Sequence, residues 1–333
     1  MVAMIATRDA YGEILVELGR ENPNIVVLDA DLSSSTKTEK FAKAFPERFF
    51  NVGIAEANMM GIAAGLARSG KIPFVSTFAV FATGRAYDQI RQSIAYPRFN
   101  VKIVASHGGL SVGPDGASHQ ALEDVALMRA IPGMVVIVPC DAHETKEAIK
   151  AALRHDGPVY VRLGREKVPS VLPDDATFEI GKGLILWPDK RREDLISSVS
   201  RGEPKESAHL FDVAFVASGI MVKPALDAAR ILGQEGKTCL VADFASIKPL
   251  DEELLVAIAK NSRLVVTCEE HSIIGGLGSA VCETLAENYP RPVLRVGVRD
   301  EFGQSGSAQE LLDAYGLTAE GIVETARKGL SKV

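Results

Sequence analysis

Apolar segments of strand length that alternate with helix-like segments are the feature that most restricts the fold of this chain. The first series of such segments lies at residues 24–30, 72–76, 101–106, 134–138 and 158–163. A strand that is covered by helices on both faces is apolar along most of its length, and successive strand–helix units produce a parallel sheet. The pattern therefore predicts an α/β fold whose sheets are parallel or mostly parallel, with helices on both faces.

A second series of alternating segments begins near Asp212 and continues to the region of Val298. Between the two series, residues 188–209 are charged and polar and contain few large apolar side chains, so we expect a mobile surface insertion there. The chain is therefore predicted to have a first domain at residues 1–170, a linker with this insertion at 171–211, and a second domain at 212–333.

Composition restricts the class of protein and its partners. The chain has 333 residues, of which 47% are hydrophobic and 24% charged, an ordinary balance for a globular protein with sizeable cores. A net charge of -6 argues against nucleic acid or an anionic membrane as the main partner. The four cysteines have no paired spacing for zinc or redox chemistry, and no signal-like or membrane-spanning run is present. We expect a soluble protein of the reducing cytoplasm.

The stretch from Phe50 to Ile90 combines a carboxylate with two aromatic rings in apolar surroundings. Glu56 stands in the first turn of a predicted helix rich in glycine and alanine, where a carboxylate needs a partner. Phe78 and Phe81 are three residues apart on a later predicted helix and share a face. Together they suit a flat, nitrogen-rich ligand. The alternative is that Glu56 complements its own helix dipole and the two rings belong to the core.

The segment from Ser106 to Gln120 is a second candidate, because its four glycines and one proline disfavour helix and strand while it carries ionisable side chains. His107, Asp115 and His119 follow a predicted parallel strand, and ligands gather at the carboxyl ends of such strands. Asp115 and His119 are plausible proton carriers. A long structural turn is the alternative for this loop.

Two sequence stretches support a family resemblance: GIAE at residues 53–56 and STFAVFATGRAYDQIRQSI at 76–94. They resemble the pyrimidine-binding half of the thiamine-diphosphate enzymes, and of transketolase in particular. In that family the glutamate holds a nitrogen of the aminopyrimidine ring, and the phenylalanines stack on the ring. The resemblance implies thiamine diphosphate as cofactor and a role for Glu56 in forming its ylid. Gly84 departs from transketolases that have a third aromatic residue at this position.

The same resemblance assigns roles to residues in other segments. It implies that His107 contacts the sugar phosphate or nearby hydroxyls, Asp115 the hydroxyl beside the ketone, and His119 the first hydroxyls or the intermediate. Asp31 matches an acid that the family places near the thiazolium ring. Phosphate contacts of the family are matched by Arg8, Ser35 and Arg165, and arginine offers forked donors for such an anion. From the residues alone, Ser35 could instead cap a helix, and Arg165 could face Glu166 or solvent.

The chain lacks the GDG motif with which these enzymes fix a divalent cation at the diphosphate. KPLD at 248–251 and EEHSIIGGLG at 269–278 resemble the transketolase C-terminal domain, so the resemblance covers the latter half of a full enzyme. It implies the carboxyl-terminal subunit of a split transketolase, which transfers a two-carbon ketol group from a ketose phosphate to an aldose phosphate in the pentose phosphate pathway. A separate N-terminal subunit would hold Mg²⁺ or another divalent cation, in a heterotetramer with two copies of each chain.

Three other identifications stay open at this point. Deoxyxylulose-phosphate synthase and the β subunit of a 2-oxo-acid dehydrogenase share the GIAE-like region and the domain order, although His107 and the TFAVF segment favour transketolase. The third is a non-catalytic, regulatory thiamine-binding half. A neighbouring gene for a GDG-bearing protein would favour the split enzyme over this third possibility.

Overall fold

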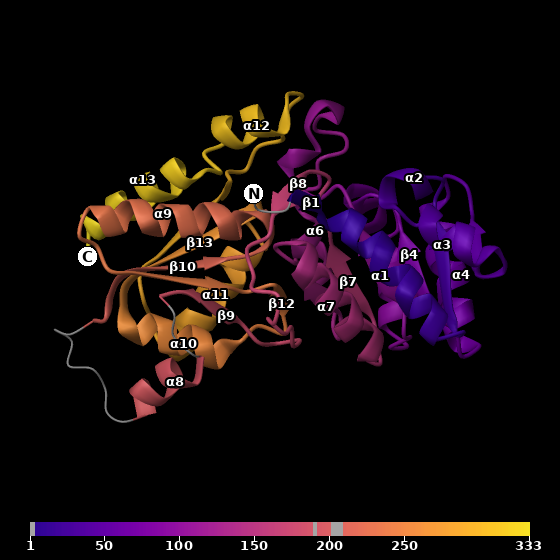
Figure 1. The fold of residues 1–333 in the computed structure, drawn as a ribbon, viewed down its shortest axis with the longest axis horizontal. Coiled ribbons are helices and arrows are strands. Elements are labelled where there is room, and N and C mark those ends of the chain that lie inside the picture. Colours follow the sequence, from indigo (N-terminus) through magenta and orange to yellow (C-terminus); the bar gives the residue numbers. More distant parts are fainter. Residues whose placement is uncertain (1–3, 189–191, 201–208) are drawn as a thin grey trace.

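The computed structural model describes residues 4–188, 192–200 and 209–333, and it forms two α/β lobes that lie side by side (Figure 1). The first lobe contains the indigo and magenta part of the chain, and the second the orange and yellow part. Each lobe has a mostly parallel sheet with helices against it. The predicted fold class is therefore confirmed.

The sheet of the first lobe has seven strands in the order β12-β6-β7-β5-β4-β2-β3. All side chains of β2, β5 and β7 are buried, which explains why these strands are apolar except for one charged residue at an end of each, namely Asp29, Lys102 and Arg162. Six of the strands are parallel, and β12 pairs with β6 in the antiparallel direction. The strands are β2 (Ile25–Asp29), β3 (Phe49–Asn51), β4 (Ile72–Ser76), β5 (Lys102–Ala105), β6 (Val135–Ile137), β7 (Val159–Arg162) and β12 (Ser246–Lys248).

Different helices cover the two faces of this sheet. α1 (Thr7–Glu21) and α7 (Ala142–Arg154) pack against each other over a core that contains Tyr11 and Ile149. α4 (Glu56–Arg68) supplies Met59 to the core on the other face. The shorter helices of this lobe are α2 (Ser33–Thr36), α3 (Glu39–Ala44) and α6 (Asp124–Arg129), with a 3₁₀ turn η1 at Pro46–Arg48.

The segment 77–95 differs from the single regular helix that its sequence predicts. It consists of the π-helical turn η2 (Phe81–Arg85), the short helix α5 (Tyr87–Gln89) and a second π-helical turn η3 (Ile90–Ala95). Ile90 and Ile94 are buried at a spacing that also fits an α-helix, so the apolar pattern alone does not reveal the wider turns. Single π-helical turns are rare and are frequent at functional sites.

The sheet of the second lobe has five strands in the order β14-β13-β10-β11-β9. Its strands are β9 (Leu184–Trp187), β10 (Phe211–Ala217), β11 (Cys239–Asp243), β13 (Ser262–Ser272) and β14 (Val293–Val298). The accompanying helices are α9 (Val222–Gln234), α10 (Glu252–Asn261), α11 (Leu277–Asn288), α12 (Ala308–Ala314) and α13 (Ala319–Leu330), with a 3₁₀ turn η5 at Gly219–Met221. Across the described ranges, none of the helices has both the length and the apolar character needed to cross a bilayer.

Two edge strands show that the two sheets do not follow the predicted domain boundaries. β9, which comes from the expected linker, pairs with β11 of the second sheet. β12, which comes from the expected second domain, joins the first sheet, where Ser246 is the partner of Ile137. One cluster of buried apolar side chains also runs through both lobes and includes Ile103 and Phe244. The two lobes are therefore joined by shared structure.

The expected mobile insertion at 188–209 is wrong for its central part. Arg192–Ser200 form the helix α8, which packs against α10 (Figure 1). Leu195 of this helix is 2% exposed and Ile196 also packs against the core, so apolar side chains anchor a segment that is otherwise mostly charged and polar. Residues 189–191 and 201–208 lie outside the described part of the chain.

Candidate active site

The candidate residues come from segments that follow the carboxyl ends of parallel strands. Asp31 follows β2, Phe78 follows β4, His107 follows β5 and Arg165 follows β7. These strands are neighbours in the first sheet, so the segments after them meet at one edge. Glu56 reaches the same region from the first turn of α4.

Glu56 is a buried acid with a specific partner. Its side chain is 5% exposed, and its Oε1 accepts a hydrogen bond of 3.0 Å from Nη1 of Arg85, whose side chain is 53% exposed. The Arg85 guanidinium also lies 4.1 Å from the centroid of the Phe81 ring. Sequence reasoning missed Arg85, although its position four residues after Phe81 is a signal for a shared helix face.

Four aromatic rings form one wall beside this ion pair. The rings of Phe78 and Phe81 are 5.8 Å apart and nearly parallel, at 14°. The His107 ring stacks on Phe78 at 3.7 Å, and the His119 ring meets Phe81 edge-on at 5.3 Å. Phe78 is buried, whereas Phe81 is half-buried and its ring lies under the Arg85 guanidinium. The structure therefore brings these four predicted residues together.

His107 is held in an unusual backbone conformation and in a neutral state. Its φ of 60° is in the left-handed region, and its Nδ1 lies 2.8 Å from Oγ of Ser106. Burial, with the positive charges of Arg8 and Arg165, lowers the pKa of His107 to about 3. At neutral pH this ring can exchange hydrogen bonds with a ligand but contributes no charge.

The predicted anion-binding residues converge in two pairs. Arg8 Nη1 donates to the backbone oxygen of Ser35 at 3.0 Å and lies 3.4 Å from Nε2 of His107. Arg165 Nη1 lies 3.6 Å from a carboxylate oxygen of Asp115 and donates to the backbone oxygen of Val112 at 2.5 Å. In the described part of the chain, Nε of Arg8 is buried without a hydrogen-bond partner, so it is a donor that an anion could use.

A short two-stranded sheet brings the segments that carry Arg8 and Arg165 together. β1 (Met4–Ala6) pairs in the antiparallel direction with β8 (Lys167–Pro169). The backbone N–H of Gly164 also donates to Oγ1 of Thr7 at 2.9 Å. The chain start is thereby fixed beside the segment that follows β7, a pairing of short segments that the sequence pattern does not indicate.

The glycine-rich loop is fixed by the second lobe. It contains the 3₁₀ segment η4 (Leu110–Asp115), and Ser111 N–H donates to Oε1 of Glu270 in β13 at 2.5 Å. At Gly109, which has a φ of 89°, an added Cβ would overlap the Glu270 carboxylate. Gln120 at the loop end donates to the backbone oxygen of Gln304 at 3.0 Å. The loop is therefore an ordered platform that exposes Asp115 and leaves His119 half-buried.

A second arginine–carboxylate pair lies under this loop. Arg162 is 6% and Asp124 0% exposed, and Arg162 Nε donates to Oδ2 of Asp124 at 2.9 Å. The same oxygen accepts from the Tyr160 hydroxyl at 2.6 Å, and Arg162 Nη2 donates to the backbone oxygens of Ala121 and Glu270. This network joins the two lobes directly below the candidate site.

Asp31 lies apart from the ring wall. It is exposed, has a φ of 66°, and accepts a hydrogen bond of 2.9 Å from Asn51 of β3. The neighbouring Asp29 is fully buried and accepts hydrogen bonds from Leu32 N–H and from the hydroxyls of Thr36 and Thr38. Burial raises the pKa of Asp29. The hydroxyl-rich segment thus donates hydrogen bonds to the buried Asp29 carboxylate, a role that sequence reasoning missed.

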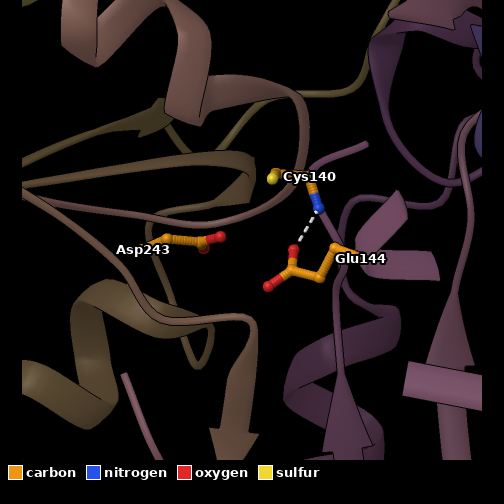
Figure 2. Close-up of side chains that lie close together, drawn as sticks. All are labelled: Cys140, Glu144 and Asp243. Carbon is orange, nitrogen blue, oxygen red and sulfur yellow. Dashed lines mark hydrogen bonds between the residues drawn. The ribbon is translucent and has the colours of Figure 1, made fainter. Parts of the chain in front are cut away.

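Cys140, Glu144 and Asp243 form a separate cluster at the junction of the lobes (Figure 2). Their possible ligand atoms all lie within 4.8 Å of one another, and Glu144 accepts a hydrogen bond of 2.7 Å from the Cys140 backbone. Burial raises the pKa of Cys140, and it raises the pKa of Glu144 to about 7. Burial and the nearby Glu144 charge together raise the pKa of Asp243. In this buried setting the groups can hold protons, and we assign no metal to this cluster.

Comparison with known families and proteins relates the whole chain to the transketolases. Residues 3–170 match the family model of the transketolase pyrimidine-binding domain, and residues 206–322 match that of the transketolase C-terminal domain. A putative transketolase C-terminal section from Methanocaldococcus jannaschii is 50% identical over 98% of this chain and 96% of its own length. The 6-deoxy-6-sulfo-D-fructose transketolase subunit SqwH of Clostridium sp. is 41% identical over 96% of this chain and 93% of its own length.

Solved structures give the same relationship. A structure described as a split gene transketolase, inactive β4 tetramer, has a TM-score of 0.86 and 56% identity, and covers 98% of this chain and 99% of its own. Transketolase from Leishmania mexicana has a TM-score of 0.80 and 27% identity, but this chain covers 46% of it. The similarity thus covers the whole length of the split-gene chain and about half of the full-length enzyme.

Proposed function

Because this chain belongs to the transketolase family, we propose that it is the carboxyl-terminal subunit of a split, thiamine-diphosphate-dependent transketolase. The proposed reaction is the reversible transfer of a two-carbon ketol group from a ketose phosphate to an aldose phosphate. The observation that carries this proposal is the buried Glu56 carboxylate beside the accessible Phe81 ring, with His107 and His119 on the same wall.

The residues around Glu56 fit an aminopyrimidine ring. That ring is flat and carries nitrogen atoms, so it requires an aromatic face and an acceptor for an N–H. Phe81 and Glu56 supply these two features, and both already contact a flat N–H donor, the Arg85 guanidinium. A buried carboxylate is also less screened by water than an exposed one, which strengthens its contact with a ring nitrogen.

The reaction requires distinct contributions from this chain. When bound, thiamine diphosphate supplies the nucleophilic carbon that accepts the two-carbon group. In our proposal Glu56 holds the pyrimidine nitrogen and stabilises its protonated form. Asp115 and His119 hold the sugar hydroxyls next to the reacting carbonyl and carry protons from them. His107, neutral at neutral pH, orients the sugar through hydrogen bonds.

Arg8 and Arg165 provide the positive charge for the anionic end of the sugar. Phosphate is the anion that we propose, with the free Nε of Arg8 as one donor and the backbone around Ser35 as a further contact. The same two cations would also accept a sulfonate, and the Clostridium relative is described as a transketolase subunit for 6-deoxy-6-sulfo-D-fructose. Comparing a ketose phosphate with this sulfo-sugar therefore tests the identity of the anion.

A separate N-terminal subunit completes the proposed enzyme. This chain matches 49% of transketolase-like protein 2 of Mus musculus and contains no GDG motif for a divalent cation. The partner would supply the diphosphate and Mg²⁺ site, in a cytoplasmic heterotetramer with two copies of each chain. The surface around Glu56 supports a protein partner, because Ile54 is 76% exposed and Gly61 and Gly65 of α4 have open space beside them.

Reconstitution tests this proposal. Each subunit alone, and the two mixed with thiamine diphosphate and Mg²⁺, would be assayed for two-carbon transfer between phosphorylated sugars. We expect turnover in the mixture and none with either chain alone. Condensation of pyruvate with an aldose phosphate in place of ketol transfer would instead favour the deoxyxylulose-phosphate synthase reaction, since such synthases are 36% identical to this chain.

A further inference from the structure

Arg85 occupies the two contact points that the proposed function gives to the cofactor ring. Its Nη1 donates to Oε1 of Glu56 at 3.0 Å, and its guanidinium lies over the Phe81 ring at 4.1 Å from the centroid. A guanidinium is planar, delocalised and rich in N–H donors, and it stacks on aromatic faces. These are the properties by which an aminopyrimidine ring would be recognised at the same place.

We infer that Arg85 is an internal stand-in for the aminopyrimidine ring, which the cofactor must displace when it binds. This inference rests on the proposed function, and it adds a residue that sets cofactor affinity by competition. One carboxylate oxygen and one face of one ring cannot accept both groups at once, so cofactor binding and the Glu56–Arg85 pair exclude each other.

The burial of the two partners determines which of them leaves. Glu56 is 5% exposed, and a buried carboxylate without a partner is strongly destabilising. Arg85 is 53% exposed, so its guanidinium can exchange the carboxylate for water at little cost. In the described residues the Arg85 guanidinium makes no other hydrogen bond that would hold it in place. Arg85 therefore binds the Glu56 carboxylate while the cofactor ring is absent and leaves it when the ring binds.

The local backbone allows this movement. Arg85 ends the π-helical turn η2, and the preceding Gly84 has no atom of the described chain within 4 Å of where its Cβ would be. Gly84 is also the position at which the sequence lacks a third aromatic side chain. Gly84 therefore adds no side chain that could obstruct a movement of Arg85.

The test measures thiamine binding to the isolated full chain by ligand-observed NMR titration into the millimolar range. Arg85→Gln should bind thiamine about two- to fivefold more tightly than the wild type, the range expected for loss of a half-exposed ion pair. Arg85→Lys, which keeps the charge but loses the flat face, should fall between the two. Arg91→Gln, an exposed arginine of η3, is the matched control and should bind like the wild type.

A double variant makes the result specific to Glu56. In the Glu56→Gln protein, adding Arg85→Gln should raise thiamine affinity less than it does in the wild type, because the carboxylate for which both groups compete is already absent and only the Phe81 face remains. Unfolding curves of each variant check that the fold is retained. Binding of Arg85→Gln that equals or falls below that of the wild type, or no detectable binding by either, would overturn the inference.

A second titration shows whether a negative result contradicts only the role of Arg85 or the proposed function as well. The wild-type chain is mixed with the N-terminal subunit and titrated with thiamine diphosphate and Mg²⁺. No binding in that mixture would overturn the proposed function, and the role of Arg85 with it. Normal binding there, without a gain for Arg85→Gln in either experiment, would overturn the role of Arg85 alone.

Discussion

Two arginine–carboxylate pairs in this protein have the same chemistry and different burial. The Asp124–Arg162 pair is 0% and 6% exposed, and its polar atoms also bind Tyr160 and backbone oxygens. The Glu56–Arg85 pair is 5% and 53% exposed, and in the described chain its arginine has one hydrogen-bond partner. The first pair holds the two lobes and the glycine-rich loop together. The second pair can open, because one of its members is already half in water.

The comparison explains how a rigid platform and an exchangeable group can be neighbours. Breaking a buried pair leaves a charge without a partner in a region of low dielectric. Breaking a half-exposed pair replaces one contact by water and leaves a buried acid that a ligand can satisfy. We therefore expect stability to depend on the first pair and cofactor recognition on the second.

Replacing Arg162 should have the largest effect. Arg162→Met leaves Asp124 buried and unpaired, and we expect a loss of about 3–5 kcal/mol in the free energy of unfolding. Urea denaturation measures this, with Arg85→Gln as the control, for which we expect a change below about 1 kcal/mol because the new amide group can still donate a hydrogen bond to Glu56. Comparable losses in the two variants would mean that burial does not separate the two pairs.

Replacing Glu56 tests whether the second pair serves chemistry. Glu56→Gln keeps the size of the side chain but removes the negative charge, so exchange of the thiazolium carbon proton in the reconstituted complex should slow about 10- to 150-fold, equivalent to about 1.5–3 kcal/mol. Proton NMR in deuterated solvent follows this step, and the unfolding free energy serves as the control. An unchanged exchange rate with lost turnover would show that Glu56 does not act in cofactor activation.

Replacing Arg8 or Arg165 tests whether arginines that we propose to face substrate affect its binding rather than protein stability. Arg8→Ala and Arg165→Ala should each raise KM for a ketose phosphate about 10- to 150-fold, equivalent to about 1.5–3 kcal/mol, with little change in kcat. The control is an unphosphorylated ketose, whose KM should stay nearly constant. Equal increases for both sugars would contradict the assignment of a phosphate site.

The Glu144–Asp243 pair in Figure 2 sharpens the comparison, because burial raises the pKa of both carboxyl groups, whereas Glu56 and Asp124 each lie beside an arginine. The pKa of Glu144 is about 7 in the folded protein and 4.5 as its ordinary value, so the folded state holds the extra proton between these pH values. Its contribution to stability is therefore fully present below about pH 4.5 and is lost as the pH rises through 7.

Asp243→Asn should remove much of this pH dependence, since an amide can donate to an ionised Glu144. We expect the variant to be more stable than the wild type at pH 8 by about 1–3 kcal/mol, and the difference to shrink toward pH 5. Thermal and urea unfolding across this pH range provide the measurement. A constant difference between the proteins at all pH values would show that Glu144 does not titrate with folding.

The sequence by itself determined the fold class and the segments from which the candidate site is built. Apolar strands and amphipathic helices at fixed spacing predict parallel sheets, because that pattern follows from burial on both sheet faces. Glu56, Phe81, His107 and Arg165 were also candidates from the sequence, because ligand-binding residues often follow strand ends and short motifs preserve their local spacing.

Tertiary structure decided which of these residues meet and how tightly each is held. The pairing of β1 with β8, the hydrogen bond of Glu270 to the loop, and the pairing of β9 with β11 and of β12 with β6 all join segments that are distant in sequence. Such contacts carry no periodicity that a sequence pattern could reveal. Arg85 is the clearest case: its residue type and its spacing from Phe81 were visible, but its role depends on a buried acid 29 residues earlier and on its own exposure to water, and both are set by packing.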